Sequence, residues 1–397
     1  MTSRAEGAVE ASYIMPTYRK PPVTFVRGER CRLMDTSGRW YLDFLSGIGV
    51  CSLGHAHPRV ARAISEQAGQ LVHVSNLFGN PVAPGVAATL DRLIGGGKQA
   101  GGKVFFANSG AEANECAIKL ARRWGGPGRH VVLSAHGSFH GRTLATLAAT
   151  GQPTKREGFE PLPEGFVHVA FDDIEALDTA MDPEVVVAVL LEPVQGEGGV
   201  VPASSGYLRA VRQLCDERGV LMMVDEVQTG LARTGTWFGF QHDDVVPDVV
   251  TMAKALGNGA PIGACWARSV VAEAFRPGDH ASTFGGQPLA TAAARETLAV
   301  MEEIGAPERA GAAGTVLREG LSKLPRIQEV RGKGLLLAAV LEEDRAAGVT
   351  AAALGKGLVV NAVSGSAIRL APPLIVSDAE IDEALDLLAR SIAEVIK

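Results

Sequence analysis

Cysteine is scarce in this sequence, and nothing in its arrangement suggests crosslinking. The 397 residues include five scattered cysteines and no C-x-x-C pair; they are Cys31, Cys51, Cys116, Cys215 and Cys265. An odd number of dispersed cysteines argues against a disulfide framework and against a zinc site. We therefore expect reduced thiols and a cytoplasmic protein.

Long apolar runs and basic runs are missing as well. Without a stretch of about 18 unbroken apolar residues, no membrane span is expected. The net charge is −6 and no basic run occurs, so nucleic acid is a poor candidate partner. Residues 1–7 lack the apolar core of a signal peptide. Hydrophobic content of 46% is that of an ordinary globular protein.

The middle of the chain alternates apolar runs with segments of helical periodicity. Runs at 103–107, 131–133, 185–191 and 220–224 predict strands, and residues 111–124 and 207–218 predict helices. The continuous run at 185–191 is typical of a strand buried on both faces. This β-α-β order predicts an α/β fold with a mostly parallel sheet.

The two ends of the chain differ from the middle, because their predicted elements are short strands and longer helices. Strands are predicted near 24–26, 32–34, 40–42, 334–340 and 357–360, and helices from Pro58 and at 290–302, 316–324 and 381–396. We predict that residues 1–60 contribute to a small domain, residues 61–285 form a large domain, and residues 286–397 complete the small α+β domain.

Lys254 is the most informative residue of the chain. It follows an apolar strand and precedes a glycine-rich turn, in the run DVVTMAKALGNG at 248–259. Burying an ammonium is costly, so burial lowers the pKa of a lysine and makes its amine a nucleophile. Asp225 ends an earlier apolar run. A lysine for an imine and an acid for a pyridinium are the two protein groups that pyridoxal phosphate chemistry needs.

Polar residues follow four of the predicted strands, at the edge where open parallel sheets bind ligands. They are Ser109 and Gly110, Glu192, Asp225 and Gln228, and Lys254. Such a set at four separate strand ends is more specific than any one motif.

Further candidates surround this set. Ser109 and Glu112 have the spacing of a capping box, while the free N–H groups of Gly110 and Ala111 could hold a phosphate. Phe139 could stack on a flat cofactor ring with Val227 on its other face, although either could be a core residue. Arg142 could clamp a carboxylate or be a surface charge.

Three histidines raise the question of a metal. His55, His57 and His140 have no matching ligand cluster elsewhere in the sequence. We therefore expect structural histidines and no metal.

These residues, in this order, resemble the class III pyridoxal phosphate-dependent aminotransferases of fold type I. The resemblance runs from about Tyr18 to Ile392 and is closest to the members that act on N-acetylornithine in arginine biosynthesis. Its most specific stretches are FANSGAEANE (106–115), FHGRT (139–143), LEPVQGEGG (191–199), DEVQTG (225–230) and STFGG (282–286). It implies a large domain with a mostly parallel seven-stranded sheet, a smaller α+β domain, and a homodimer with shared active sites.

The resemblance also implies a role for each matching residue. Lys254 would form the internal aldimine with pyridoxal 5′-phosphate and move the proton, and Asp225 would keep the pyridine nitrogen protonated. Cofactor contacts would come from Gly110, Ala111, Phe139, Val227 and Gln228, with Thr283 reaching in from the partner subunit. Arg142 and Ser282 would contact the acylated donor, and Arg369 would bind the α-carboxylate of glutamate and 2-oxoglutarate.

Two positions bear on substrate choice. By the resemblance, Glu197 would pair with Arg369 while the donor reacts and swing away for the dicarboxylate. Ile48 stands where ornithine-specific relatives carry a tyrosine that contacts the free α-amine, and an apolar residue suits an acylated nitrogen better. The chain departs from the family's usual residues at Ala232, Ala255, Asn258 and Gln287, which leaves the catalytic groups intact.

The favoured interpretation is transamination of N-acetyl-L-ornithine with 2-oxoglutarate in a ping-pong cycle. The same mechanism could serve succinylornithine, acetyl-lysine, succinyldiaminopimelate, ornithine or 4-aminobutyrate. An aminomutase of the same fold is a different class, and Arg369 argues against it, because such an enzyme has no use for a 2-oxoglutarate site. A non-catalytic cofactor-binding regulator is disfavoured by the intact Lys254 and Asp225.

Overall fold

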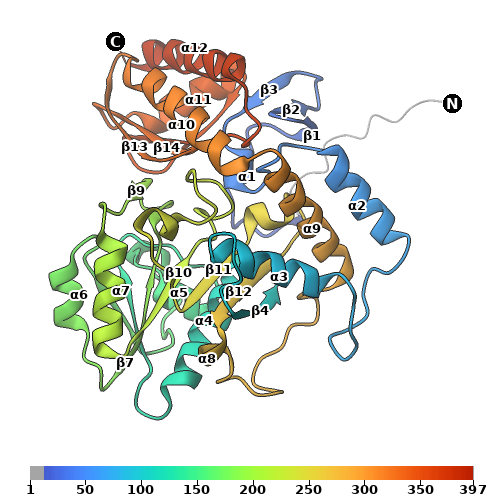
Figure 1. The fold of residues 1–397 in the computed structure, drawn as a ribbon. Coiled ribbons are helices and arrows are strands. Elements are labelled where there is room, and N and C mark those ends of the chain that lie inside the picture. Colours follow the sequence, from blue (N-terminus) through green and yellow to red (C-terminus); the bar gives the residue numbers. More distant parts are fainter. Residues whose placement is uncertain (1–12, 397) are drawn as a thin grey trace.

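A seven-stranded sheet is the core of the larger part of the molecule in the computed structural model, which describes residues 13–396 (Figure 1). In spatial order its strands are β4 (Gly102–Ala107), β12 (Gly263–Arg268), β11 (Val249–Met252), β10 (Leu221–Asp225), β7 (Val186–Leu191), β5 (Val131–Ala135) and β6 (Phe166–Val169). Strand β12 runs antiparallel to both of its neighbours, and the other pairs are parallel. The predicted α/β fold with a mostly parallel seven-stranded sheet is confirmed.

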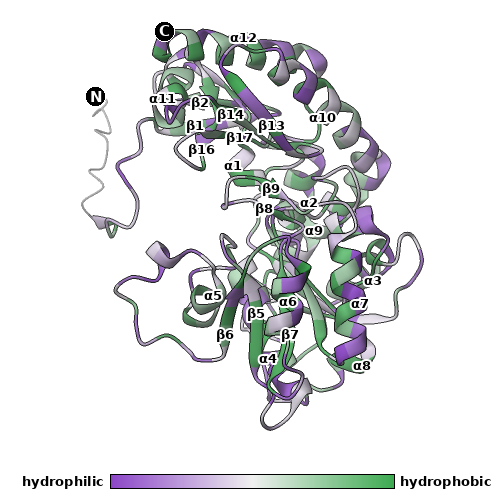
Figure 2. Cartoon of the chain, turned by 90° about the vertical axis from the view of Figure 1, so that its left-hand side faces the viewer, coloured by the Kyte–Doolittle hydropathy of each residue, from purple (hydrophilic) through white to green (hydrophobic). Residues whose placement is uncertain are grey.

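Apolar side chains cover both faces of this sheet. Along β7, Val189 and Leu191 face one apolar cluster, and Val187 and Leu190 face another. Helix α4 (Gly110–Gly125) covers the second face. This arrangement explains the unbroken apolar run of β7, because a strand with helices on both sides has no solvent face. Figure 2 shows the apolar strands of this layer between more polar helices.

The other helices of the large part are shorter or lie at its border. They are α3 (Ala83–Ile94), α5 (Leu144–Ala149), α6 (Ile174–Ala180), α7 (Tyr207–Arg218) and α8 (Ser269–Ala272), with 3₁₀ turns η2 (Pro153–Lys155), η3 (Gly239–Asp243) and η4 (Lys254–Gly257). A two-stranded ribbon joins β8 (Val194–Gln195) and β9 (Val201–Pro202).

Two smaller sheets form the upper part of Figure 1. One joins β1 (Phe25–Glu29), β2 (Arg32–Asp35), β3 (Trp40–Asp43) and β15 (Leu358–Val359). The other joins β13 (Ile327–Lys333), β14 (Leu336–Leu341), β17 (Ala367–Leu370) and β16 (Asn361–Ala362). Because β3 pairs in parallel with β15, N-terminal and C-terminal segments share one sheet. This pairing supports the proposed small domain built from both ends of the chain, although residues 1–12 and 397 lie outside the described residues.

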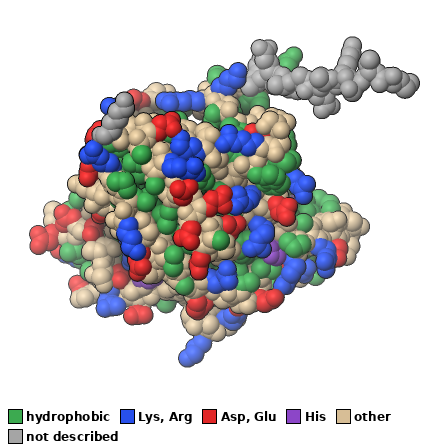
Figure 3. All heavy atoms as spheres, turned by 90° about the horizontal axis from the view of Figure 1, so that it is seen from above, with side chains coloured by type: hydrophobic (Ala, Val, Ile, Leu, Met, Phe, Trp, Pro, Cys, Tyr) green, Lys and Arg blue, Asp and Glu red, His purple; other side chains and the backbone are tan. Residues whose placement is uncertain are grey.

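Helices complete this part and join it to the large sheet. Helices α10 (Ala306–Ser322), α11 (Ala346–Lys356) and α12 (Asp378–Val395) lie over the small sheets, and α1 (Ser46–Gly49) lies below them. The long helix α9 (Pro288–Glu303) packs along α2 (Pro58–Ala68) and connects the two parts. None of the helices in residues 13–396 is long and apolar enough to cross a membrane. On the face seen from above, acidic and basic side chains are interspersed (Figure 3).

Several predicted elements have shifted bounds, and two of the shifts have a clear cause. The helix expected at 316–324 begins at Ala306, ten positions earlier, because glycines and alanines in its first half weaken the apolar periodicity. The strand expected at 334–340 begins at Leu336, since Gly334 has a φ of 54° in the turn before it.

Candidate active site

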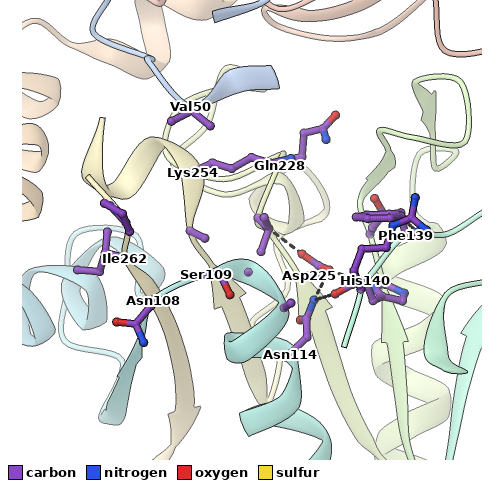
Figure 4. A pocket seen from close by; sticks show the side chains of 18 of the residues that line it. Val50, Asn108, Ser109, Asn114, Phe139, His140, Asp225, Gln228, Lys254 and Ile262 are labelled. Carbon is purple, nitrogen blue, oxygen red and sulfur yellow. Dashed lines mark hydrogen bonds and ion pairs between the residues drawn. The ribbon is translucent and has the colours of Figure 1, made fainter. Parts of the chain in front are cut away.

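A cavity of about 380 Å³ lies beyond the carboxyl ends of β4, β7, β10 and β11. Eight of the predicted site residues line it: Gly110, Ala111, Phe139, Arg142, Asp225, Val227, Gln228 and Lys254. Figure 4 shows Lys254 and Gln228 at one side and Asp225, Asn114 and His140 at another. The sheet topology therefore brings together side chains from four strand ends.

Helix α4 points its N-terminus at this cavity. The Ser109 hydroxyl accepts a hydrogen bond from the Glu112 N–H at 3.2 Å, so the predicted cap is present. The N–H groups of Gly110 and Ala111 lie in the first turn, where a helix offers them no carbonyl partner. A Cβ on Gly110 would approach Val227 Cγ1 to 2.8 Å, so only glycine fits this wall. The free N–H groups and the positive end of the helix dipole together make this corner of the cavity suitable for binding an anion.

Asp225 is fixed by a buried hydrogen-bond network. Its Oδ2 accepts from Asn114 Nδ2 at 2.7 Å and lies 2.9 Å from His140 Nδ1, while its Oδ1 accepts from the Val227 N–H at 3.0 Å. Thr251 donates to Asn114 Oδ1 at 2.6 Å and so fixes the orientation of that amide. The carboxylate therefore has one orientation relative to the cavity.

Lys254 reaches the cavity from the turn η4 that follows β11, and its backbone has a φ of 41°. Burial lowers the pKa of its amine to about 8, and the nearby charge of Arg369 adds to this effect. The carboxylates of Glu197, Asp225 and Glu192 oppose the shift without cancelling it. About a tenth of the amine is therefore neutral, and so nucleophilic, at pH 7, far more than for an ordinary lysine.

Glu192 is a second buried acid at the cavity wall. It accepts hydrogen bonds from the Phe139 N–H at 3.0 Å and from the Gly196 N–H at 3.3 Å. Burial raises its pKa to about 7, and Asp225 contributes as a neighbouring negative charge. Glu192 thereby positions the backbone of Phe139, whose ring faces the cavity.

Arg369 and Glu197 form an ion pair beside the cavity. Arg369 Nη1 donates to Glu197 Oε1 at 2.6 Å and to Gln228 Oε1 at 3.1 Å, and Arg369 Nε donates to Asn361 Oδ1 at 3.1 Å. Arg369 is fully buried, and its Nη2 has no hydrogen-bond partner among the described residues. Burial tends to raise the pKa of Glu197, but the Arg369 charge outweighs it and the net pKa is lowered.

The remaining predicted residues lie around this core. Arg142 stands 5.6 Å from the centre of the Phe139 ring in a cation–π arrangement. Ser282 Oγ accepts from Asn108 Nδ2 at 3.1 Å, and Asn108 lines the cavity. Thr283 is exposed and lies outside the cavity lining of its own chain.

Sequence reasoning missed two members of the site. Asn114 is buried on the apolar side of α4 and donates a hydrogen bond to Asp225. The sequence indicates this role by placing a polar residue within the apolar stripe of Ala113, Cys116 and Ala117. His140, which we expected to be merely structural, contacts Asp225, and its Nε2 is buried with no partner among residues 13–396. No group of three or more metal-binding side chains occurs in that range.

Comparisons with known proteins agree with this geometry. The family model for class III aminotransferases matches residues 13–392. The chain belongs to the class III aminotransferases. The acetylornithine aminotransferase of Caldanaerobacter subterraneus is 47% identical over 97% of this chain and 98% of its own length. That of Gloeobacter violaceus is 48% identical over 95% and 94%.

Solved structures of two other aminotransferases have the same fold. The ornithine aminotransferase of Toxoplasma gondii superimposes with a TM-score of 0.91, with 35% identity over 97% of this chain and 93% of that one. The N-acetylornithine aminotransferase of Stenotrophomonas maltophilia gives 0.83, with 38% identity over 97% and 98%.

As a class III aminotransferase, the protein depends on pyridoxal phosphate and transfers an amino group from a donor to a keto acid. Its cavity fits that cofactor. The corner at Gly110 and Ala111 suits a phosphate, and the apolar side chains of Phe139 and Val227, which both line the cavity, suit a flat ring. Asp225 offers a fixed carboxylate for a protonated ring nitrogen, and Lys254 offers an amine for an aldehyde.

The pKa of Lys254 predicts how the cofactor-free protein takes up pyridoxal phosphate. Because the pKa is lowered to about 8, the reactive neutral amine is lost below pH 8 and dominates above it. The rate of uptake is therefore expected to rise about tenfold per pH unit below 8 and to level off above it. Stopped-flow absorbance between pH 6 and 10 measures this profile. A plateau that begins only near pH 10, as for an exposed lysine, would contradict the prediction.

Proposed function

We propose that the protein transfers the δ-amino group of N-acetyl-L-ornithine to 2-oxoglutarate, giving N-acetyl-L-glutamate 5-semialdehyde and L-glutamate in arginine biosynthesis. The observation that carries the proposal is the ion pair of Arg369 with Glu197 at the edge of the cavity, where Arg369 also bonds Gln228 of the cavity lining. The near identity in length and the 47% identity to acetylornithine aminotransferases support it.

Each residue has one task in this scheme. The cofactor, when bound, supplies an electron sink for the carbanion that deprotonation leaves on the substrate. Lys254 would hold the cofactor at its aldehyde carbon and, as a free amine, would move the proton at the substrate carbon. Asp225 would hold a proton at the ring nitrogen, and Gln228 would donate a hydrogen bond to the ring oxygen. Arg142 and Ser282 bind the donor.

The pair of Arg369 and Glu197 allows one site to take two unlike substrates. With the acylated donor, which has no second carboxylate to offer here, Glu197 satisfies Arg369 at 2.6 Å. With 2-oxoglutarate, the substrate carboxylate replaces Glu197, and Glu197 turns to solvent, to which 28% of its side chain is already exposed. Arg369 stays fixed by Asn361 and Gly196 in both states. Leaving the buried Arg369 unpaired would cost free energy. The ion pair with Glu197 avoids this cost while the donor is bound, and so it improves discrimination between the two substrates.

Replacing Glu197 by alanine is expected to lower discrimination between the two substrates. Arg369 would then be permanently available to carboxylates, so the ratio of kcat/KM for N-acetylornithine over glutamate should fall about tenfold or more, equivalent to about 1.4 kcal/mol. Half-reaction kinetics measured by the cofactor absorbance check this. Glu66→Ala, an exposed change on α2, is the control, and an unchanged ratio in Glu197→Ala would count against the role.

The choice of donor is tested by a direct assay. We expect N-acetylornithine to give the highest kcat/KM among N-acetylornithine, succinylornithine, acetyl-lysine, succinyldiaminopimelate, ornithine and 4-aminobutyrate, with turnover dependent on added 2-oxoglutarate. A higher value for another amine would replace the proposed donor and keep the mechanism. Turnover without a keto acid would favour an aminomutase.

We also propose a cytoplasmic homodimer in which Thr283 contacts the cofactor phosphate of the partner. The exposed position of Thr283 supports this, as do the neighbouring exposed apolar side chains Phe284, Leu77 and Phe78. Asn76 donates to the carbonyls of Ser282 and Gly285 and holds these two segments together. The mixed surface charge and the five free cysteines support a cytoplasmic protein without nucleic acid as a partner.

A further inference from the structure

A left-handed turn lies beside the active site. Four successive residues have positive φ: Ser46 at 47°, Gly47 at 65°, Ile48 at 63° and Gly49 at 76°. A β-branched residue such as Ile48 rarely adopts this conformation, because its side chain collides with the backbone. Strain of this kind persists only where the surroundings hold the backbone in place, and it gathers at functional sites.

The turn is anchored at its start by buried groups. Ser46 donates its hydroxyl to the Ala371 carbonyl at 2.7 Å, and the Ser46 N–H donates to Asp43 Oδ1 at 2.8 Å. These bonds tie the turn to the small sheets. The other end, after Gly49, is bonded at Ser52, whose hydroxyl accepts from Arg233 Nη2 at 3.0 Å and whose carbonyl accepts from the Leu374 N–H at 2.7 Å, and by one further side chain.

Asn258 holds that other end. Its Oδ1 accepts from the Leu53 N–H at 2.8 Å, and its Nδ2 donates to the Gly54 carbonyl at 3.2 Å. Asn258 directly follows the turn Lys254–Gly257 and has a left-handed φ of 45°, a conformation that asparagine tolerates better than most residues. One side chain therefore joins the segment after the strained turn to the turn that carries Lys254.

The segment between the two anchors forms part of the cavity wall. Val50 lines the cavity together with Lys254 and Ile262, and Figure 4 shows it on the same side as Lys254. Leu53 is completely buried, so its displacement would move the whole segment. By contrast, the hydrogen bonds of Arg369 run to Asn361, Gly196, Glu197 and Gln228. Its link to residues 46–54 is indirect, through the Ser46 bond to Ala371.

We propose that Asn258 is a positioning residue that selects the amino donor: it holds residues 46–54 against the Lys254 turn, so that Val50 closes the donor side of the cavity. The inference rests on the proposed division of the site between an acylated donor and a dicarboxylate. Asn258 acts through Val50 and touches neither substrate.

Asn258→Gly removes both hydrogen bonds and keeps the left-handed backbone. In the holoenzyme, we expect kcat/KM for the donor to fall about tenfold, mainly through KM, while the half-reaction with glutamate stays within twofold of wild type. Hydrogen exchange of the peptide that covers residues 46–54 should become at least tenfold faster. The cofactor absorbance spectrum should stay unchanged, because Lys254 and Asp225 keep their places.

Val50→Ala and the double variant complete the experiment. If Asn258 acts through Val50, the donor effects of the two single changes are less than additive in the double variant. Equal losses of kcat/KM in both half-reactions would mean that Asn258 merely positions Lys254, and would overturn the proposal. Additive donor effects in the double variant, or unchanged hydrogen exchange in residues 46–54, would overturn it as well. The donor used is the best one of the wild-type panel. If wild type prefers a donor other than N-acetylornithine, the proposed function is refuted. The comparison of wild type with the Asn258 and Val50 variants, made with that donor, still tests the role of Asn258.

Discussion

Lys254→Ala is expected to lower kcat by about 10⁴-fold or more, the largest effect of any single change in this chain. The reason is that, in the proposed function, one amine performs two tasks, as the nucleophile that holds the cofactor and as the base that moves the proton. No other lysine lines the cavity, so none can replace it within the described residues. The contacts at Gly110, Ala111 and Asp225 remain, so the variant should still bind the cofactor non-covalently.

Reduction of the holoenzyme with borohydride, followed by peptide mapping, measures the first task directly. Wild type should be labelled at Lys254 and the variant nowhere. Lys103→Ala is the matched control, because Lys103 is exposed and pairs with Glu273 at the surface, 3.1 Å away. A label on another lysine, or a kcat within about 100-fold of wild type in Lys254→Ala, would refute the assignment.

Much of the site could be predicted from the sequence because it lies at strand ends. A polar residue that directly follows an apolar run is visible without a structure, and parallel topology brings such residues to one edge. Lys254, Asp225, Gln228 and Gly110 are of this kind, and all of them line the cavity. The fold was predictable for a related reason, since a run such as β7 with no polar residue requires cover on both faces.

Other features depend on contacts that no local pattern reveals. Helix α11, AAGVTAAALGK, is apolar almost all round, so it has no periodicity to detect. Strand β12 gives no sign of its antiparallel direction, which follows from how β11 and β4 flank it. Asn258 looks like an ordinary turn residue. Its bonds to Leu53 and Gly54 join positions more than 200 residues apart, which only the folded chain brings together.

Asp225→Asn is expected to lower kcat by about 10³-fold, the second largest effect. The amide has the same shape but no charge, so it cannot hold a proton at the ring nitrogen, and the carbanion loses its electron sink. The change also disturbs the network, because Asn114 and the Val227 N–H both donate to Asp225 and an amide has only one acceptor oxygen. One of these donors would face the new NH₂ group.

The experiment separates this electrostatic role from a loss of structure. Steady-state kcat is measured with saturating cofactor, the cofactor Kd by absorbance titration, and the Tm of the holoenzyme by calorimetry. Asp244→Asn is the control, because the Asp244 side chain is 87% exposed and its ion pair with Arg209 lies at the surface. We expect the Asp225 variant to be saturated by the cofactor and still to have the lowered kcat. A kcat within tenfold of wild type would show that the neutral amide suffices, and that charge at the ring nitrogen does not drive proton removal in this enzyme.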